Sequence, residues 1–151
     1  LASEEAEKRG YDQTLWLDAQ ENKYMEEVGS MNIFFVINGV VVTPMLAGSI
    51  LPGITRKSTI ELLKARGYTV EERRVSVDEV VKAAEDGTLN EIFGTGTAAV
   101  VSPVGSFGYN GKDYTVGDGQ MGKITKYVYD ELTGIQTGVK PDEFGWVERI
   151  V

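Results

Sequence analysis

The stretch EIFGTGTAAVVSPV, residues 91–104, decides the fold class. Its small residues, Gly94–Thr95–Gly96–Thr97–Ala98, interrupt an apolar run that resumes at Ala99–Val101. We expect strands at Glu91–Phe93 and at Ala98–Val101, with a loop between them. Because glycine lacks a side chain, a ligand can approach the main chain of this loop closely, and the two threonines add hydroxyl groups. The stretch therefore predicts two strands that flank a turn open to a ligand.

Outward from this stretch, hydrophobic periodicity predicts strands mixed with helices. Strands are expected at Thr14–Asp18, Tyr24–Val28, Met31–Ile37, Val40–Thr43 and Val70–Val77, with Asn–Gly turns at 38–39 and 110–111 and a second hairpin at Gly108–Val116. Helices are expected at Leu1–Gly10, read as the second half of a helix, after the loop Ser49–Arg56 as far as Gly67, from the Ser76–Glu79 capping box onward, and across Ile124–Ile135. Two hairpins among helices predict an α+β fold whose mixed, partly antiparallel sheet has helices packed around it.

The composition narrows the classes of function. A chain of 151 residues suffices for one domain with a core. Because cysteine and histidine are both absent, disulfides, thiolate sites, the usual neutral-pH base and the commonest metal ligand are all missing, and we expect no metal site. The net charge of −8 argues against nucleic acid or an anionic membrane as a partner. Without a membrane-length apolar run or a signal peptide, a cytoplasmic protein is expected.

Two turns have the chemistry of anion-binding sites. Pro52–Gly53–Ile54–Thr55 precedes a helix, where free amides and the helix dipole favour negative charge. The loop at Gly94–Ala98 offers threonine hydroxyls beside free amides. Together they indicate a ligand that carries a phosphate. The residues alone leave other interpretations open: Thr55 as an ordinary helix cap, and the two loop glycines as a bulge. Neither turn matches a Walker or Rossmann pattern.

A third element is the acidic stretch Glu26–Asn32. Because side chains alternate along a strand, either Glu26 or Glu27 must point inward if the flanking segments are strands. A buried carboxylate needs a cationic or hydrogen-bonding partner, and a protonated pyridine nitrogen would serve. An exposed acid on an edge strand is the alternative interpretation.

Several blocks of the sequence, in order, closely resemble the branched-chain amino acid aminotransferases, which are fold-type IV enzymes that use pyridoxal 5′-phosphate. The blocks are Tyr24–Val36, Leu51–Arg56, Phe93–Ala98, Tyr129–Gly138 and Phe144–Trp146. The resemblance spans nearly the whole chain. It implies the large domain of such an enzyme, in which a pseudo-barrel sheet is surrounded by helices.

The resemblance also implies the site residues. Glu27 matches the carboxylate that keeps the pyridine nitrogen protonated, so that the ring can act as an electron sink. Ile54 and Thr55 match the groups that hold the cofactor phosphate, and Thr95 is a neighbour with weaker support. The full implied set is Glu27, Gly53, Ile54, Thr55, Gly96 and Thr97 for the cofactor, and Thr97 and Ala98 for the substrate carboxylate.

By the same resemblance, the Schiff-base lysine, a small N-terminal domain and a phosphate-binding arginine lie upstream of Leu1–Arg9. We therefore expect residues 1–151 to be the C-terminal large domain, without a catalytic residue of its own. The sequence has lysines in polar or helix-surface contexts only, where an amine stays protonated: Lys8, Lys23, Lys57, Lys64, Lys82, Lys112, Lys123, Lys126 and Lys140. This chain alone is expected to be inactive and to bind phosphate or the cofactor only weakly, without a covalent bond.

The implied parent enzyme transfers the amino group of leucine, isoleucine or valine to 2-oxoglutarate, as a homodimer acting on amino acid and 2-oxo acid substrates. Two alternatives stay open. D-amino acid transaminases and aminodeoxychorismate lyase share the architecture, although the Met31–Phe35 block and the Phe144–Trp146 ending favour the branched-chain group. The second alternative is a stand-alone, non-enzymatic binding module. The helix expected at Leu1 argues against it, because no N-cap residue precedes that helix.

Overall fold

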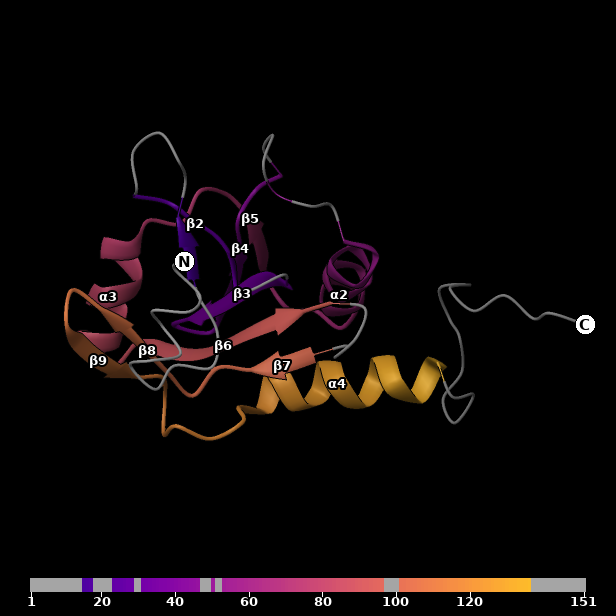
Figure 1. Cartoon of the computed structure of the whole chain (residues 1–151). Helices are drawn as coiled ribbons and strands as arrows, with labels where there is room; N and C mark the ends of the chain where they lie inside the picture. Colours follow the sequence, from indigo (N-terminus) through magenta and orange to yellow (C-terminus); the bar gives the residue numbers. More distant parts are fainter. Residues whose placement is uncertain are drawn as a thin grey trace, which may run out of the picture.

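The computed structural model describes residues 15–17, 23–28, 31–46, 50, 53–96 and 101–136 (Figure 1). The helix expected at Leu1–Gly10 and the strand start expected at Ala98–Val100 lie outside the described residues. The described strands are β1 (Leu15–Leu17), β2 (Met25–Val28), β3 (Met31–Ile37), β4 (Val40–Thr43), β5 (Val70–Glu72), β6 (Leu89–Thr95), β7 (Val101–Pro103), β8 (Ser106–Tyr109) and β9 (Lys112–Thr115). The described helices are α2 (Ile54–Ala65), α3 (Val77–Asp86) and α4 (Lys123–Gln136).

Strand β3 is the centre of the main sheet. Along one edge it pairs with β6, from Asn32 opposite Thr95 to Ile37 opposite Leu89. Its other edge is shared, because β2 pairs with the start of β3 and β4 pairs with its end. All of these pairs are antiparallel, whereas β4 and β5 are parallel, so the predicted mixed, partly antiparallel sheet is confirmed.

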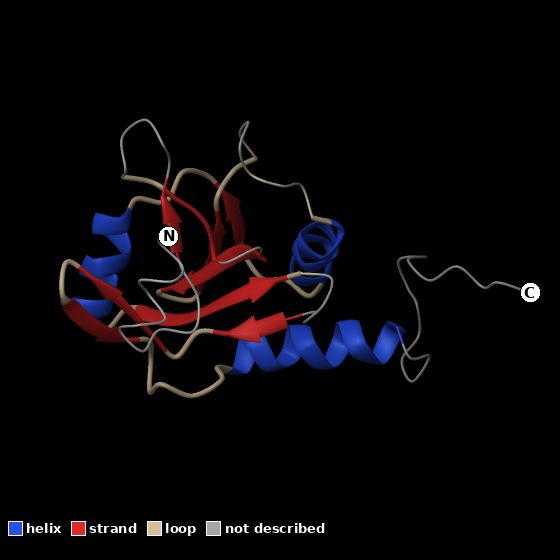
Figure 2. Cartoon of the chain, in the orientation of Figure 1, coloured by secondary structure: helices blue, strands red, loops and turns tan. Residues whose placement is uncertain are grey.

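Both faces of β3 are buried, which explains its nearly continuous apolar sequence. Ile33 and Phe35 point to one face, where they pack in a cluster with α3 and the β8–β9 hairpin. Phe34 and Val36 point to the other face, in a cluster with α2 and α4, and Phe34 stacks on Phe93 at 5.0 Å between ring centroids. Figure 2 shows the helices placed on both sides of the strands, which confirms the predicted α+β class.

The Asn–Gly turns form as predicted. Asn38 and Gly39 have φ angles of 51° and 79°, and Asn110 and Gly111 have 51° and 76°. Positive φ at both central residues is the mark of the type I′ turn, which matches the twist of a tight hairpin.

The predicted strand at Val70–Val77 ends earlier, at Glu72. Ser76 then caps α3, where its Oγ accepts a hydrogen bond from the Glu79 amide at 3.1 Å. In a capping box the Glu79 side chain would also accept a hydrogen bond from the Ser76 amide. Here the Glu79 carboxylate pairs instead with the Arg73 guanidinium, at 2.6 and 2.8 Å. The hydrogen bonds to the Glu79 carboxylate, and next the hydrogen bond to Glu71, raise the pKa of Arg73.

The loop predicted at Gly94–Ala98 begins later, because β6 runs through Gly94 and Thr95. A Cβ added to Gly94 would lie 2.9 Å from Val28 Cγ1 and 3.2 Å from the Met31 sulfur. Gly94 is therefore a strand residue whose missing side chain lets neighbouring strands pack closely, which is one of the known uses of glycine within a sheet.

Helix α4 begins against a buried carboxylate from β6. The Glu91 side chain accepts hydrogen bonds from the amides of Ile124 and Thr125, at 3.1 and 2.7 Å, and from the Thr125 hydroxyl at 2.7 Å. A Cβ on Gly122 would collide with this carboxylate, so glycine is required there. The first turn of α4 is thus capped by a carboxylate from a residue 33 positions earlier in the chain.

Replacing Glu91 by alanine is expected to lower the free energy of unfolding by about 3 kcal/mol, because buried amides and a hydroxyl lose their acceptor. The measurement is urea unfolding followed by circular dichroism. Asp130→Ala is the control, since its pair with Lys126 is exposed and is expected to contribute at most about 0.5 kcal/mol. Equal stability of the two variants would contradict the role given to Glu91.

Candidate functional site

Three polar side chains form a row across β2, β3 and β6. In the strand register, Glu27 lies opposite Asn32, and Asn32 lies opposite Thr95. Residues directly opposite one another project from the same face of a sheet, about 5 Å apart, so the row extends about 10 Å. Phe93 and Phe34 continue on this face toward α2 and α4. The row therefore lies at the polar end of the face that α2 covers.

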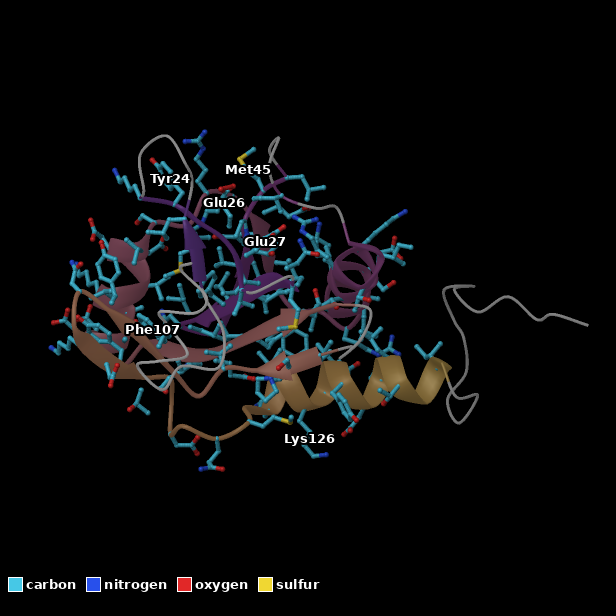
Figure 3. All side chains as sticks on the ribbon, viewed as in Figure 1. Tyr24, Glu26, Glu27, Met45, Phe107 and Lys126 are labelled. Atoms are coloured by element: carbon cyan, nitrogen blue, oxygen red, sulfur yellow. The ribbon has the colours of Figure 1, made fainter. Side chains whose placement is uncertain are left out.

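Glu27 is half-buried on a strand that is paired on both sides, with Trp16 opposite it on β1 and Asn32 on β3. The edge-strand interpretation of this acid is therefore wrong. Glu26 and Glu27 are both labelled in Figure 3, and the pairing of β1 with β2 is irregular at Glu26, because Trp16 lies opposite Glu27 and Leu17 lies opposite Met25.

The N-terminus of α2 lies directly over the row. Gly53, the residue that precedes the helix, packs so tightly against Asn32 that an added Cβ would collide with Asn32 Oδ1. Ile54 is 81% exposed and Thr55 is half-buried. The predicted phosphate-binding turn thus meets the middle of the row that contains Glu27 and Thr95.

The first turn of α2 has the opposite electrostatics to those that stabilise a helix. The residue at the N-cap position is Gly53, which has no side chain to cap the helix. The first turn has no acidic residue and contains the basic residues Arg56 and Lys57. By contrast, α3 has a serine cap with Asp78 and Glu79, and α4 has the Glu91 carboxylate. An isolated helix favours acids at this end, so the first turn of α2 is arranged to receive an anion from outside the helix.

Thr95 contributes a second polar group. It is 1% exposed, and its hydroxyl oxygen has no hydrogen-bond partner in the part of the chain that the structure describes. Gly96 follows and is half-buried, with a hypothetical Cβ 3.0 Å from Met31 Cγ. Thr97 and Ala98 lie outside the described residues, so their predicted contacts with phosphate and substrate stay predictions.

Sequence reasoning missed two residues that the structure places beside the predicted ones. Asn32 is 6% exposed and sits between Glu27 and Thr95. Its signal was a lone amide in the otherwise apolar run of β3. Arg56 is 4% exposed, although it follows Thr55 directly in the first turn of α2. A basic residue at a helix start was its signal, because the helix dipole disfavours a cation there.

This donor set fits a phosphorylated pyridine. A carboxylate suits a protonated ring nitrogen. Helix amides, and a buried hydroxyl that has no hydrogen-bond partner among the described residues, suit a phosphate. Glu27 lies at one end of the row and Thr95 at the other, about 10 Å apart, and the helix start meets the row at Asn32 between them.

Comparison with known proteins gives the following matches. Residues 1–107 match the family model described as "Amino-transferase class IV". Over 146 residues the chain is 59% identical to a probable branched-chain-amino-acid aminotransferase of Staphylococcus epidermidis, covering 97% of this chain and 41% of that protein. The chain thus spans about two fifths of the length of the curated relatives it matches.

Solved structures give the same result. The branched-chain amino acid aminotransferase from Escherichia coli matches with a TM-score of 0.81 and 35% identity, over 99% of this chain and 46% of that one. A second branched-chain amino acid aminotransferase, from T.th., is complexed with N-(5′-phosphopyridoxyl)-L-glutamate. It matches with a TM-score of 0.81 and 33% identity, over 97% of this chain and 46% of that one.

Replacing Gly53 by alanine is expected to push the first turn of α2 away from β3, because the new methyl group would collide with Asn32 Oδ1. The expected loss of stability is about 1–3 kcal/mol, measured by urea unfolding. In the double variant Gly53→Ala/Asn32→Ala the collision is removed. The Gly53 substitution should therefore cost clearly less in the Asn32→Ala background than in the wild type, and an equal cost in both backgrounds would contradict the close approach.

Proposed function

Because the chain belongs to the class IV aminotransferase family, we propose that residues 1–151 form the large, cofactor-binding domain of a branched-chain amino acid aminotransferase. The cofactor is pyridoxal 5′-phosphate, and it would lie between the Glu27–Asn32–Thr95 row and the N-terminus of α2. The observation that carries this proposal is the meeting of a helix start without a cap with a half-buried acid on the same face of the sheet.

The substrate assignment has support from the relatives. A probable branched-chain-amino-acid aminotransferase is 59% identical to this chain. One structural relative is complexed with a phosphopyridoxyl derivative of L-glutamate, the amino acid that corresponds to 2-oxoglutarate. We therefore propose that the whole enzyme exchanges amino groups between leucine, isoleucine or valine and 2-oxoglutarate. The homodimer and the cytoplasmic location stay predictions, and none of the described helices is long and apolar enough to cross a membrane.

In this proposal the chain's own residues bind and orient the cofactor. The Glu27 carboxylate accepts a hydrogen bond from the ring nitrogen and keeps it protonated. The amides at Ile54 and Thr55, the Thr55 hydroxyl and Thr97 would hold the phosphate, and the buried Thr95 hydroxyl would be a further donor. The Thr97 and Ala98 amides would receive the substrate carboxylate. When bound, pyridoxal 5′-phosphate supplies the electron sink that amino-group transfer needs.

The described lysines do not suit a covalent attachment. All of them are exposed: Lys23, Lys57, Lys64, Lys82, Lys112, Lys123 and Lys126. A lysine that forms a Schiff base needs a desolvated or electropositive site that lowers its pKa, and an exposed side chain is not desolvated. We therefore propose that this chain binds the cofactor without a covalent bond and does not catalyse transamination alone.

Titration of the 151-residue chain with pyridoxal 5′-phosphate, followed near 400 nm and then by borohydride reduction and intact mass, tests this proposal. The expected result is saturable binding with no reducible adduct at one equivalent. A stoichiometric adduct on one lysine would contradict the assignment of the chain as a domain without its own catalytic amine.

Replacing Glu27 by glutamine is expected to weaken cofactor binding about tenfold, because a neutral amide cannot hold the ring nitrogen protonated. Glu26→Gln is the matched control, since it removes the same charge from the adjacent residue, which lies outside the register that forms the polar row. Equilibrium dialysis with pyridoxamine 5′-phosphate gives both dissociation constants. Equal loss in the two variants would mean that net charge alone, and not the position of Glu27, decides binding.

The substrate class is tested on the full-length protein that contains this sequence. Transamination of leucine, isoleucine and valine with 2-oxoglutarate is expected. Activity on D-alanine alone would favour a D-amino acid transaminase of the same architecture.

A further inference from the structure

Arg56 is the most buried charged side chain in the described part of the chain, and its partners lie outside its own helix. Its Nη2 donates to the Pro44 carbonyl oxygen at 3.0 Å and to Glu72 Oε1 at 3.0 Å. Pro44 directly follows β4, and Glu72 is the last residue of β5. A single guanidinium thus joins the first turn of α2 to the ends of two neighbouring strands.

Those two strand ends form one paired edge. Strands β4 and β5 are parallel, and Thr43, the residue before Pro44, lies opposite Glu72. The Arg73 amide also donates to the Thr43 carbonyl oxygen at 3.1 Å. The strand ends are therefore fixed to each other independently of Arg56, and they provide a firm support for the helix start.

Helix stability does not explain a cation at this position. A positive charge in a first turn opposes the helix dipole, and burying a guanidinium has a desolvation cost that one partly exposed carboxylate offsets only in part. Glu72 is 42% exposed, which weakens the pair further. What the arrangement does provide is a fixed position for a turn that begins at a glycine and lacks a side-chain cap.

We propose that Arg56 is a positioning residue for the phosphate. By holding the first turn of α2 against the ends of β4 and β5, it keeps the amides of Ile54 and Thr55 aimed at one point over the polar row. In this proposal Arg56 acts through these amides: its Nη2 is engaged by Pro44 and Glu72, and its Nε is buried with no hydrogen-bond partner among the described residues. This inference rests on the proposed function, because it assumes that the turn binds the phosphate of the cofactor.

The test compares pyridoxamine 5′-phosphate with pyridoxamine, which lacks the phosphate and shares the ring. Neither compound has an aldehyde that reacts with exposed lysines. Dissociation constants for both are measured by equilibrium dialysis on the 151-residue chain and on its Arg56→Met, Arg56→Lys, Glu72→Gln and Arg73→Met variants. Arg73 is the matched control, because its guanidinium also bridges two acceptors, the carboxylates of Glu71 and Glu79, but its side chain is 39% exposed.

In Arg56→Met, binding of pyridoxamine 5′-phosphate is expected to weaken about tenfold, while binding of pyridoxamine stays within about twofold. Arg56→Lys should recover part of this loss, because an ammonium keeps the charge and its donors but, on a shorter side chain, cannot place a nitrogen where Nη2 bonds to both acceptors. Glu72→Gln should keep nearly wild-type preference for the phosphate, since the bond to the Pro44 carbonyl remains. Arg73→Met should match the wild type.

A general loss of structure would weaken the binding of both ligands together. The ratio of the two dissociation constants therefore reports only on how Arg56 positions the phosphate-binding amides. If Arg56→Met fails to unfold cooperatively, Arg56→Lys decides, and a wild-type ratio in that variant overturns the inference. Wild-type ratios in both Arg56 variants overturn the inference and leave the proposed function intact. A wild-type chain that does not prefer the phosphorylated ligand overturns the proposed cofactor site, and this inference with it.

Discussion

Pairing of β3 along both edges is the constraint on which the rest of the structure depends. Because β6 occupies one edge while β2 and β4 share the other, Asn32 is flanked by Glu27 and Thr95 at the same level of the sheet. A slip of one residue in either pairing would move these polar groups to the opposite face. The stacked pair of Phe34 and Phe93, one alternation further along, fixes this register through the core.

Helix α2 completes the site because its N-terminus is left without the partners that the other described helices have. Ser76 and the acids of the first turn stabilise α3, and Glu91 stabilises α4 from a distant strand. In α2 a glycine precedes the helix, and the fixed support comes from a buried arginine that binds the ends of β4 and β5. The proposed phosphate position thus combines amides left for an outside anion with a first turn that Arg56 joins to the ends of β4 and β5.

Much of this fold could be predicted from the sequence, because its signals are local. The apolar run Met31–Ile37 and the turn at Asn38–Gly39 have few alternatives, and the structure confirms both. Gly94 and Thr95 were predicted as loop and proved to be strand, since the reason for glycine there is contact with Val28, which is distant in the sequence.

The same limit applies to the site. The resemblance to a family brought together Glu27, Thr55 and Thr97, but local chemistry alone left each with another interpretation. Asn32 and Arg56 stand out in the sequence only because each is unusual at its position. Asn32 is an amide in an otherwise apolar strand, and Arg56 is a cation at a helix start. Their partners could not be predicted, because strand register and the packing of a helix on a sheet are set by contacts between segments far apart in the chain.

The most direct measurement of the central claim is amide chemical-shift mapping of the ¹⁵N-labelled chain during titration with pyridoxamine 5′-phosphate. The account predicts that the largest changes fall on the amides of Ile54, Thr55 and Thr95 and on the neighbours of Glu27, with one common dissociation constant. Changes confined to other surfaces, or changes at α2 without any at β2 and β6, would contradict a single site formed by the helix start and the polar row.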